Sequence, residues 1–408
     1  MLPLPQAQRQ VFGSLPTMPV ESIELGHALG LVLARPVVAD HPVPPFDNSA
    51  MDGFAVRAED VVVVPVDLKV TEDVPAGSVA SRRVESGTAI KIMTGAPIPE
   101  GADAVARVED TEQAGEMVTI RQSVLSGTAI RAAGGDVSAG TTLVETGVRL
   151  NSAYIGVLAN NGCARLQVHR RPVVAVASTG DELVPVDGGE LGPGQIRDSN
   201  RPMLIALLAE LGVEVLDLGR IPDDEQRLLS TLEDAAARAD AVVTSGGVSM
   251  GEYDLVKAVL KKLGDVDFWQ VAMQPAKPFA FGRLSSTPFF GLPGNPVSSF
   301  VAFEQFVRPA VLHMMNAQRI LRPRLSGRTE VALETDPEKT VFVRVVTRVE
   351  GEVRWCQPSG KQSSNVLTAV AHGDAFAVVG QGTERIEAGE AVTLEMYRWP
   401  EERTIDEL

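Results

Sequence analysis

Between residues 172 and about 315, short apolar, β-branched runs alternate with segments whose apolar residues recur at helical spacing. The runs predict buried strands and the segments predict amphipathic helices. The predicted strands are 172–179, 213–219, 240–247, 266–273, 277–284 and 287–294, and the predicted helices are 199–212, 223–239, 253–264 and 295–315. This alternation predicts an α/β fold in which helices cover both faces of a mostly parallel sheet.

The segments on either side of this region have a different pattern. Residues 54–150 are rich in Val, Thr and Gly with few helix signals, which predicts β structure. Residues 321–408 alternate apolar and polar positions between turn residues, which predicts a small antiparallel β domain. The first forty residues contain one or two short helical patterns without an obvious core of their own. We therefore expect a chain that combines α/β and β parts.

Length, composition and charge narrow the class of protein. A chain of 408 residues exceeds one ordinary core, so about two to four domains are expected. No apolar run approaches the roughly 18 residues of a membrane span, and the first residues lack a secretory signal. Cys163 and Cys356 lie far apart, which favours reduced thiols in a cytoplasm. The net charge of −16 argues against nucleic-acid binding but not against a small anionic ligand.

Three loops at the carboxyl ends of predicted strands carry candidate chemistry, because ligands of open α/β sheets bind at this edge. STGDEL follows the first strand, TSGGVSMGEYD follows the third, and GLPGNPVSS precedes the last helix. Gly246 and Gly247 would let backbone N–H groups converge on a phosphate, and Ser245 and Ser249 add hydroxyls. A plain glycine turn is the alternative interpretation of this loop.

The loop before the last helix has a second anion-binding feature. Asn295 can cap the helix and Pro296 suits its first position, so free amides there would favour an anion. A plain helix start explains these two residues equally well. Pro293 and Gly294 are harder to explain as a plain helix start, since they predict a sharp turn of the chain into the helix with few side chains.

Several acidic residues are expected to share the cleft that these loops form. Carboxylates around a phosphate repel it unless a cation lies between them, and Mg²⁺ prefers a few carboxylates together with ligand oxygens. The sequence therefore predicts an anion-and-metal site, with solvated or helix-capping acids as the alternative. The candidates are Asp181, Glu182, Asp223, Asp224, Glu252 and Asp254.

Candidate positive side chains are few. Lys277 stands between two prolines just beyond the fourth predicted strand, and a surface lysine in a turn is the alternative reading. Arg131, Arg344 and Lys361 are further candidates that the sequence alone does not bring to the cleft.

Near the N-terminus, PPFDNSAMDGFAV at 44–56 presents Asp47 and Asp52 from a loop stiffened by two prolines. An ordinary Asp-Gly turn would account for Asp52. The loop alone does not explain why it presents carboxylates.

Six ordered motifs together closely resemble the molybdopterin molybdenumtransferase (MoeA) family, which is related to the C-terminal domain of gephyrin. The motifs are PPFDNSAMDGFAV, IMTGAPIPEGADAV, STGDEL, TSGGVSMGEYD, KPFAFG and GLPGNPVSS. The resemblance covers nearly the whole chain, although the region after 321 matches by position and β character more than by motif. It implies that molybdate is inserted into the dithiolene of adenylylated molybdopterin, with Mg²⁺-dependent release of AMP.

The resemblance also implies an elongated cytoplasmic homodimer of four-domain subunits. The N-terminal β region would reach the cleft of the partner subunit and complete its site, which gives the loop at 44–56 a role. A contact with molybdopterin adenylyltransferase is a further expectation. The expected divisions are an elongated connecting domain at 1–39 and 140–171, an inserted β-rich domain at 40–139, a three-layer αβα molybdopterin-binding domain at 172–320, and a small β-barrel-like domain at 321–408. Residues 1–19 are expected to pack on the αβα domain.

Site residues follow from matching positions in the family. Catalysis or molybdate handling is implied for Asp52, Thr94, Asp136 and Glu182, with Asp47 as a possible companion of Asp52. Substrate binding is implied for Asp223, Asp254, Lys277, Pro293 and Pro296, beside Ser245, Gly246, Gly247 and Ser249. The expected Mg²⁺ ligands are Glu182, Glu252 and Asp254. Without the resemblance, an ordinary turn residue is an equally good interpretation of Thr94 and of Asp136.

The chain departs from the family pattern at four positions. Gln274 stands where many members have a lysine, and Ala276 replaces a usual glycine. Ala132 and Ala133 occupy positions where arginines are common. These changes bear on the affinity for the oxyanion and on the preference between molybdate and tungstate.

Two other functions are alternatives to insertion. One is the preceding step, adenylylation of molybdopterin, for which something like residues 172–315 would suffice. The long N-terminal region with Asp52 favours insertion. The other is a non-catalytic, gephyrin-like scaffold, which the acids and glycines of the expected cleft argue against.

Overall fold

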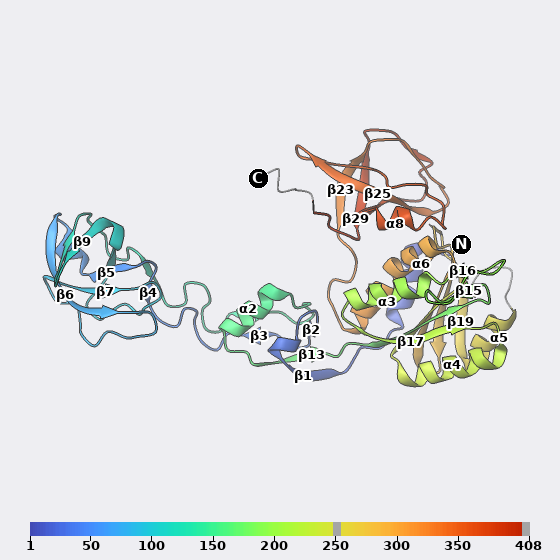
Figure 1. The fold of residues 1–408 in the computed structure, drawn as a ribbon, viewed down its shortest axis with the longest axis horizontal. Helices are drawn as coiled ribbons and strands as arrows, with labels where there is room; N and C mark the ends of the chain where they lie inside the picture. The colour runs from blue at the N-terminus through green and yellow to red at the C-terminus, as the bar shows by residue number, and fades with distance from the viewer. Residues whose placement is uncertain (248–253, 402–408) are drawn as a thin grey trace.

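The computed structural model describes residues 1–247 and 254–401, without the side chains of 254–257. The chain is elongated, with a β domain near the N-terminus at one end and a central α/β region at the other (Figure 1). A thinner connecting part lies between them, and a C-terminal β barrel lies next to the central region. The expected N-terminal, central and C-terminal domains are therefore present.

The central region is organised around a six-stranded sheet in the order β17-β14-β18-β22-β21-β19. β17, β14, β18 and β22 are parallel, whereas β21 and β19 are antiparallel to their neighbours. Only Ser285 and Ser286 separate β21 from β22, which is too short for a parallel crossover. The sheet is mostly parallel, as predicted. Its strands are β14 (Val173–Thr179), β17 (Glu214–Ile221), β18 (Ala241–Ser245), β19 (Gly264–Gln270), β21 (Pro278–Leu284) and β22 (Thr287–Leu292).

Helices pack on both faces of this sheet. Successive side chains of β14 point to opposite faces, so Val174 and Val176 enter one apolar cluster and Ala175 and Ala177 enter another. The first cluster includes residues of α1, α3, α6 and α7, and the second includes residues of α4 and α5. The helices are α1 (Leu4–Gly13), α3 (Asn200–Glu210), α4 (Glu225–Arg238), α5 (Asp254–Leu263), α6 (Pro296–Ala302) and α7 (Arg308–Met314).

The predicted helix over 295–315 is interrupted by one wider turn. A π-helical segment, η4 (Phe303–Val307), joins α6 to α7. Pro309 has no N–H to donate to the carbonyl of Gln305, and that carbonyl instead accepts a hydrogen bond from Gln8 Nε2 of α1 at 3.1 Å. The interruption therefore helps to hold the N-terminal helix on the central region.

The N-terminal β domain has a six-stranded sheet in the order β8-β5-β7-β6-β10-β9. Its strands are β5 (Gly53–Val56), β6 (Val66–Val74), β7 (Thr88–Ile92), β8 (Ala104–Arg107), β9 (Thr111–Ala114) and β10 (Met117–Ile120). Two short strands, β4 (Asn48–Ser49) and β11 (Ile130–Arg131), pair beside it. The connecting part contains β1 (Val20–Glu24), β2 (Val32–Leu33), β3 (Val37–Val38), β12 (Thr142–Val144), α2 (Ser152–Asn160) and β13 (Arg165–His169).

The C-terminal domain contains a closed barrel of five strands. The strands pair in the order β25-β26-β23-β29-β27, and β27 pairs with β25 to close the ring. A separate apolar cluster fills the interior. The prediction of a small β barrel is confirmed. Its strands are β23 (Arg324–Thr329), β25 (Thr340–Glu350), β26 (Val353–Pro358), β27 (Ala375–Val379) and β29 (Ala391–Met396), and β20 (Met273–Gln274) of the central region pairs with β25.

None of the helices in the described ranges is both long and apolar enough to span a membrane.

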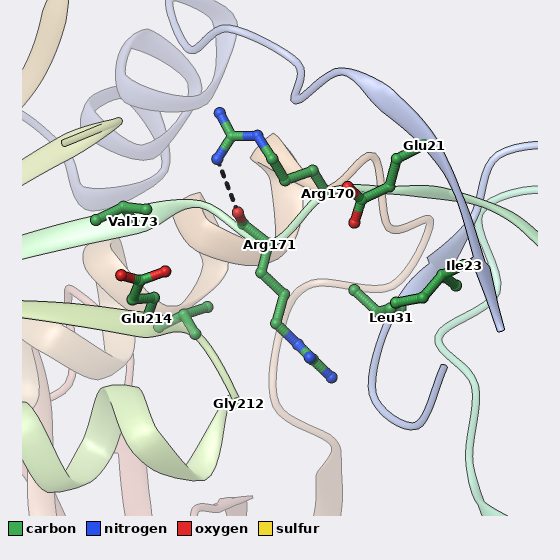
Figure 2. A pocket seen from close by; sticks show the side chains of 9 residues that line it. Glu21, Ile23, Leu31, Arg170, Arg171, Val173, Gly212 and Glu214 are labelled. Carbon is green, nitrogen blue, oxygen red and sulfur yellow. Dashed lines mark hydrogen bonds between the residues drawn. The ribbon is translucent and has the colours of Figure 1, made fainter. Parts of the chain in front are cut away.

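A partly buried ion pair anchors the connecting part to the central sheet. Arg170, just after β13, donates to both carboxylate oxygens of Asp240 at 2.7 and 2.8 Å, and the Val173 amide donates to the same carboxylate at 2.8 Å. Partial burial raises the pKa of Asp240, but these hydrogen bonds outweigh it and leave the pKa below its usual value. Beside the pair, Glu21 and Glu214 flank a groove of about 420 Å³ that Arg170 also lines (Figure 2).

We expect Asp240→Asn to lower the free energy of unfolding by about 1.5–3 kcal/mol at pH 7, because it removes charged hydrogen bonds to Arg170. The pKa of Asp240 is lower in the folded than in the unfolded chain. Its stabilisation is therefore complete above the unfolded pKa, about 4, and is lost as the pH falls through the folded pKa. Denaturant unfolding should show the gap between variant and wild type narrowing in acid.

Asp234→Asn is the matched control, since Asp234 pairs with Arg238 on the exposed surface of α4. It should cost less than about 1 kcal/mol. Equal losses in the two variants at pH 7 would contradict the anchoring role of Asp240.

Candidate active site

The three predicted loops meet at the carboxyl edge of the central sheet. They follow Thr179 at the end of β14, Ser245 at the end of β18 and Leu292 at the end of β22. A cleft of about 610 Å³ lies between them. Of the residues predicted for the site, the cleft is lined by Glu182, Ser245, Gly246, Pro293 and Pro296.

Gly246 lies where the β18 loop passes close to the end of β14. A Cβ atom at this position would lie 2.5 Å from the Thr179 carbonyl oxygen and 2.8 Å from its hydroxyl. The φ angle is +98°, which side chains disfavour. The Gly246 amide donates to the Leu292 carbonyl at 3.1 Å, so it is already used and does not face a phosphate as expected. Gly246 thus shapes the cleft by its small size.

The loop after β14 returns to the cleft through a short parallel pair, β15 (Leu183–Val184) and β16 (Ile196–Arg197). The Ile196 amide donates to the Glu182 carbonyl at 2.8 Å. The Glu182 carboxylate folds back over Gly180, where a Cβ atom would lie 2.4 Å from its Oε2. The exposed Glu182 side chain therefore lies over Gly180 at the cleft, on a loop whose backbone is fixed by the β15–β16 pair.

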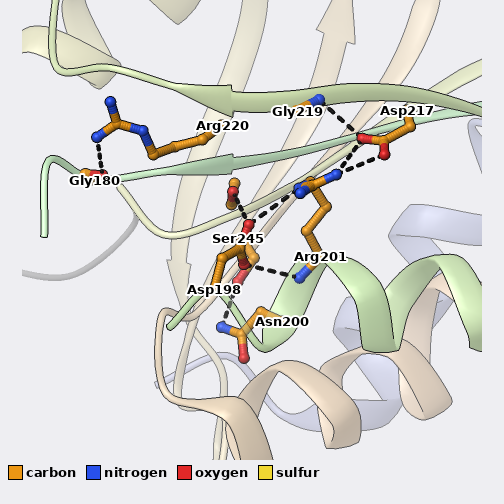
Figure 3. Close-up of polar contacts among 9 residues, drawn as sticks. Gly180, Asp198, Asn200, Arg201, Asp217, Gly219, Arg220 and Ser245 are labelled. Atoms are coloured by element: carbon orange, nitrogen blue, oxygen red, sulfur yellow. Dashed lines mark hydrogen bonds and ion pairs between the residues drawn. The ribbon is translucent and has the colours of Figure 1, made fainter. Parts of the chain in front are cut away.

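A buried carboxylate beneath the cleft was missed by the sequence analysis. Asp198 is only 1% exposed and accepts hydrogen bonds from the Ser178 hydroxyl at 2.6 Å and from Arg201 Nε at 3.0 Å. Arg201 also reaches Asp217 on β17 at 2.6 Å (Figure 3). The Asp-Ser-Asn sequence before α3 looked like an ordinary helix start, and its partners lie on distant strands.

The side chain of Asn200 links two of the loops (Figure 3). Asn200 Nδ2 donates to the Ser245 hydroxyl at 2.8 Å and to the Gly294 carbonyl at 2.7 Å. Ser245 in turn donates to the Pro293 carbonyl at 3.3 Å. Ser199 is the N-cap residue of α3 but its side chain makes no capping hydrogen bond, and the Arg201 amide donates to Asp198 instead at 3.3 Å.

The start of α6 also differs from the expectation. The Asn295 side chain makes no capping hydrogen bond. The Val297 amide, which was expected to be free for an anion, donates to the Ser364 carbonyl at 3.1 Å. This contact brings the segment after β26 to the cleft, where Asn365 forms part of the lining.

The remaining acidic candidates have mixed positions. Asp224 caps α4 by accepting from the Arg227 amide at 2.8 Å, which is the ordinary structural alternative. The exposed Asp223 lies near Asp181, which accepts from the Asp223 amide at 3.4 Å. Neither Asp223 nor Asp224 lines the cleft.

Other predicted residues near the β18 loop are only partly described. Ser249 and Glu252 lie outside the described residues, and Asp254 begins α5 without a described side chain. Gly247 has a φ of +69° and does not line the cleft. Within the described residues, no group of three or more His, Cys, Asp or Glu side chains could hold a metal ion.

The basic candidates do not crowd the cleft. Lys277 is exposed next to Pro278, which lines the cleft. Arg344 is 2% exposed, burial lowers its pKa to about 10, and it donates to the Ser363 carbonyl at 3.3 Å. It therefore lies behind the segment that brings Asn365 to the cleft.

The other positions noted in the sequence lie away from the cleft. Lys361 is exposed, and so is Gln274 in β20. Arg131 lies in the N-terminal domain, within 3.5 Å of the Ala50 carbonyl, beside the exposed Ala132.

The N-terminal candidates form a separate group. Asp52 Oδ1 accepts from the Thr94 amide at 2.7 Å and from its hydroxyl at 2.8 Å. These two hydrogen bonds, the amide first, lower the pKa of Asp52. Asp47 accepts a hydrogen bond from the Ala133 amide at 2.7 Å. The exposed Asp136 lies in the same loop as Ala133. This domain lies at the opposite end of the chain from the cleft (Figure 1).

Three family models match the chain. They are the MoeA N-terminal region (domains I and II) over residues 2–162, a probable molybdopterin binding domain over 175–313, and the MoeA C-terminal region (domain IV) over 326–397.

Relatives match over most of their length. A protein of Haemophilus influenzae named molybdopterin molybdenumtransferase is 38% identical over 402 residues, which cover 97% of this chain and 99% of that protein. Molybdopterin molybdenumtransferase 2 of Mycobacterium tuberculosis is 42% identical over 80% of this chain and 82% of its own length. The crystal structure of the molybdopterin biosynthesis MoeA protein of Pyrococcus horikoshii superimposes with a TM-score of 0.83 at 28% identity, covering 97% of this chain and 100% of that one.

Gly246→Ala should destabilise the chain by about 1–3 kcal/mol, because the new methyl group meets the Thr179 carbonyl at a strained φ angle. Gly294→Ala is the matched control, since the nearest atom to its Cβ would be 3.9 Å away and its φ is not in the left-handed region. Denaturant unfolding compares the two variants. Equal stability would show that Gly246 is not sterically required.

Thr94→Val should raise the pKa of Asp52, because it removes the hydroxyl donor but keeps the backbone amide. The pKa should stay below that of an ordinary aspartate, since the amide is the larger cause of the shift. Thr94→Ser keeps a hydroxyl and should titrate like the wild type. Carboxyl NMR titration gives the three values, and an unchanged value in Thr94→Val would contradict the contact.

Proposed function

The chain belongs to the MoeA family of molybdopterin molybdenumtransferases, which are transferases of molybdenum cofactor biosynthesis, and we propose that it inserts molybdate into adenylylated molybdopterin with Mg²⁺-dependent release of AMP. The observation that carries this proposal is the cleft that three loops build at the carboxyl edge of the central sheet. Its lining combines Ser178, Ser245 and Asn295 with the side-chain-poor Gly246 and Gly294. A pterin nucleotide needs polar groups of this kind and a close backbone approach.

The cleft must accept an anion although the chain carries a net charge of −16. We propose that the β18 loop contacts the phosphates through groups other than the Gly246 amide, which is bonded to the Leu292 carbonyl, and that Lys277 approaches them from beside Pro278. This proposal is supported by the position of the loop at the cleft and by the scarcity of basic side chains in its lining. Arg344, buried behind Ser363, would act through that segment.

The proposed Mg²⁺ ligands are Glu182, Glu252 and Asp254, together with phosphate oxygens of the substrate. Glu182 suits this role because its exposed carboxylate lies at the cleft over Gly180. A hard divalent cation prefers such oxygen ligands and neutralises the charge of a leaving AMP when bound. The chain's own part is to hold Glu182 in place and to orient the phosphates.

Asp52 and Thr94 are proposed to act on the molybdate side of the same reaction, with Asp136 nearby. Within one chain they lie far from the cleft (Figure 1), so a second copy must supply them. Exposed apolar side chains at Phe46, Met51 and Met93 lie in the same loops and favour a protein interface. We therefore propose a homodimer in which the N-terminal domain of one subunit completes the cleft of the other.

The low pKa of Asp52 fits this role. Two hydrogen bonds from Thr94 hold one carboxylate oxygen and keep the group ionised at neutral pH. A fixed carboxylate that stays ionised can accept a hydrogen bond from a protonated oxygen or a water at the molybdate and so orient it. It would not hold an oxyanion unaided, because like charges repel.

We also propose that the protein works in the cytoplasm, without nucleic acid or membrane, and receives its substrate by contact with a molybdopterin adenylyltransferase. The scattered reduced cysteines and acidic charge support the location.

Subunit complementation tests the divided site. Asp52→Ala and Glu182→Gln should each slow molybdate-dependent AMP release by ~10²-fold or more, because each removes a positioned group. A heterodimer of the two variants, isolated with two different affinity tags, combines an intact Asp52 with an intact Glu182 at one of its two sites. It should recover about half of the wild-type rate, as two-fold symmetry requires.

Asp234→Asn, which lies on the exposed surface of α4, paired with wild type serves as the control for tagging and exchange. A heterodimer no more active than its parents would place both residues in one chain's site. Formation of an AMP–pterin adduct from ATP, without molybdate-dependent release, would favour the adenylyltransferase alternative. Binding of adenylylated molybdopterin without turnover would favour the non-catalytic, gephyrin-like scaffold.

A further inference from the structure

Asn200 occupies an unusual place for a helix-start residue. It is the first residue of α3, is only 8% exposed, and lines the cleft. Its side chain does not cap its own helix. Both amide hydrogens are used across the sheet edge, one on the Ser245 hydroxyl after β18 and one on the Gly294 carbonyl before α6.

The orientation of this amide follows from its partners. The Gly294 carbonyl can only accept a hydrogen bond, so the nitrogen must face it. The Asn200 oxygen is then buried without a partner among the described residues. Thr179 Oγ1, at the end of β14, is also buried without a partner there. Buried polar atoms are normally paired, so a side chain that serves stability alone would not leave its acceptor in this state.

We propose that Asn200 is a positioning residue for the transfer reaction, whose two donors set the spacing between the β18 loop and the turn at Pro293 and Gly294. This inference rests on the proposed function of the cleft. The two loops leave neighbouring strands, β18 and β22, which are paired as far as Ser245 and the Gly246 amide. Beyond that point the loops are joined by side-chain contacts through Asn200 and Ser245. A nucleotide bound between them needs both at a fixed separation, since a small misplacement of binding groups costs much of their effect.

The geometry also explains why an acidic or apolar residue would not serve. An ionised aspartate offers two acceptors and no donor, and it would face the Gly294 carbonyl oxygen. A leucine would leave that carbonyl and the Ser245 hydroxyl without their donor. Only a side chain with two hydrogens on one atom can satisfy both partners from this position.

Affinity for AMP, measured by calorimetry with Mg²⁺ present, tests the role. Asn200→Asp and Asn200→Ala should both bind AMP at least ~10-fold more weakly at pH 8 than the wild type, as expected for lost loop positioning. Burial beside the Gly294 carbonyl oxygen raises the pKa of an aspartate at this position above the ordinary value of about 4, so that in acid the variant protonates and regains one donor. The AMP affinity of the aspartate variant, divided by that of the alanine variant, should then rise several-fold. The titration of AMP affects both variants equally and cancels in this ratio. A constant ratio from pH 8 to pH 5 would overturn the proposal.

A double-mutant cycle with Ser245→Ala provides a second test if one variant folds poorly. Because Asn200 acts through Ser245, the two losses in AMP affinity should not add, and the double variant should bind about as weakly as Asn200→Ala alone. Additive losses would show that the two side chains act independently. Circular dichroism and denaturant unfolding of each variant establish that the chain remains folded.

The outcome also separates this inference from the proposed function. If the wild-type protein binds neither AMP nor adenylylated molybdopterin, the function assigned to the cleft fails. If the wild type binds AMP and all Asn200 variants bind it equally well, only the positioning role fails.

Discussion

The close passage of the Gly246 loop beside the end of β14 is the constraint on which the cleft depends. A backbone that lies this near the Thr179 carbonyl leaves no room for a side chain, and its φ angle also requires glycine. The passage brings the end of β18 into reach of Asn200, whose amide then bridges to Gly294. Three loops from distant parts of the chain are thus held at one edge, and Arg197 is the basic side chain among the described residues that line the cleft between them.

A second constraint is the distance between this cleft and the N-terminal carboxylate. Asp52 is fixed by Thr94 in a domain that an extended connecting part holds away from the central sheet (Figure 1). The connection to the sheet is anchored by Arg170 and Asp240. In this arrangement the two candidate groups lie in different domains of the chain, which is why we propose that a second subunit unites them.

Local patterns in the sequence predicted the strands and helices of the central region and the β character of both flanking domains. They could not predict pairing, such as the closure of the barrel by β27 and β25, because pairing partners are far apart in sequence. The same limit applies at the site. The glycine and proline loops were evident from their composition, whereas Asp198 and Asn200 resembled helix-start residues until their partners on other strands were known. The interruption at η4 also depended on a distant contact, from Gln8.

The most direct measurement is a crystal structure of the protein with AMP, Mg²⁺ and molybdate. The account predicts that the nucleotide lies in the cleft between Gly246 and Pro293, and that the loop bearing Asp52 of a second subunit faces its phosphate. A nucleotide bound elsewhere, or paired subunits whose Asp52 loops remain remote from either cleft, would contradict it.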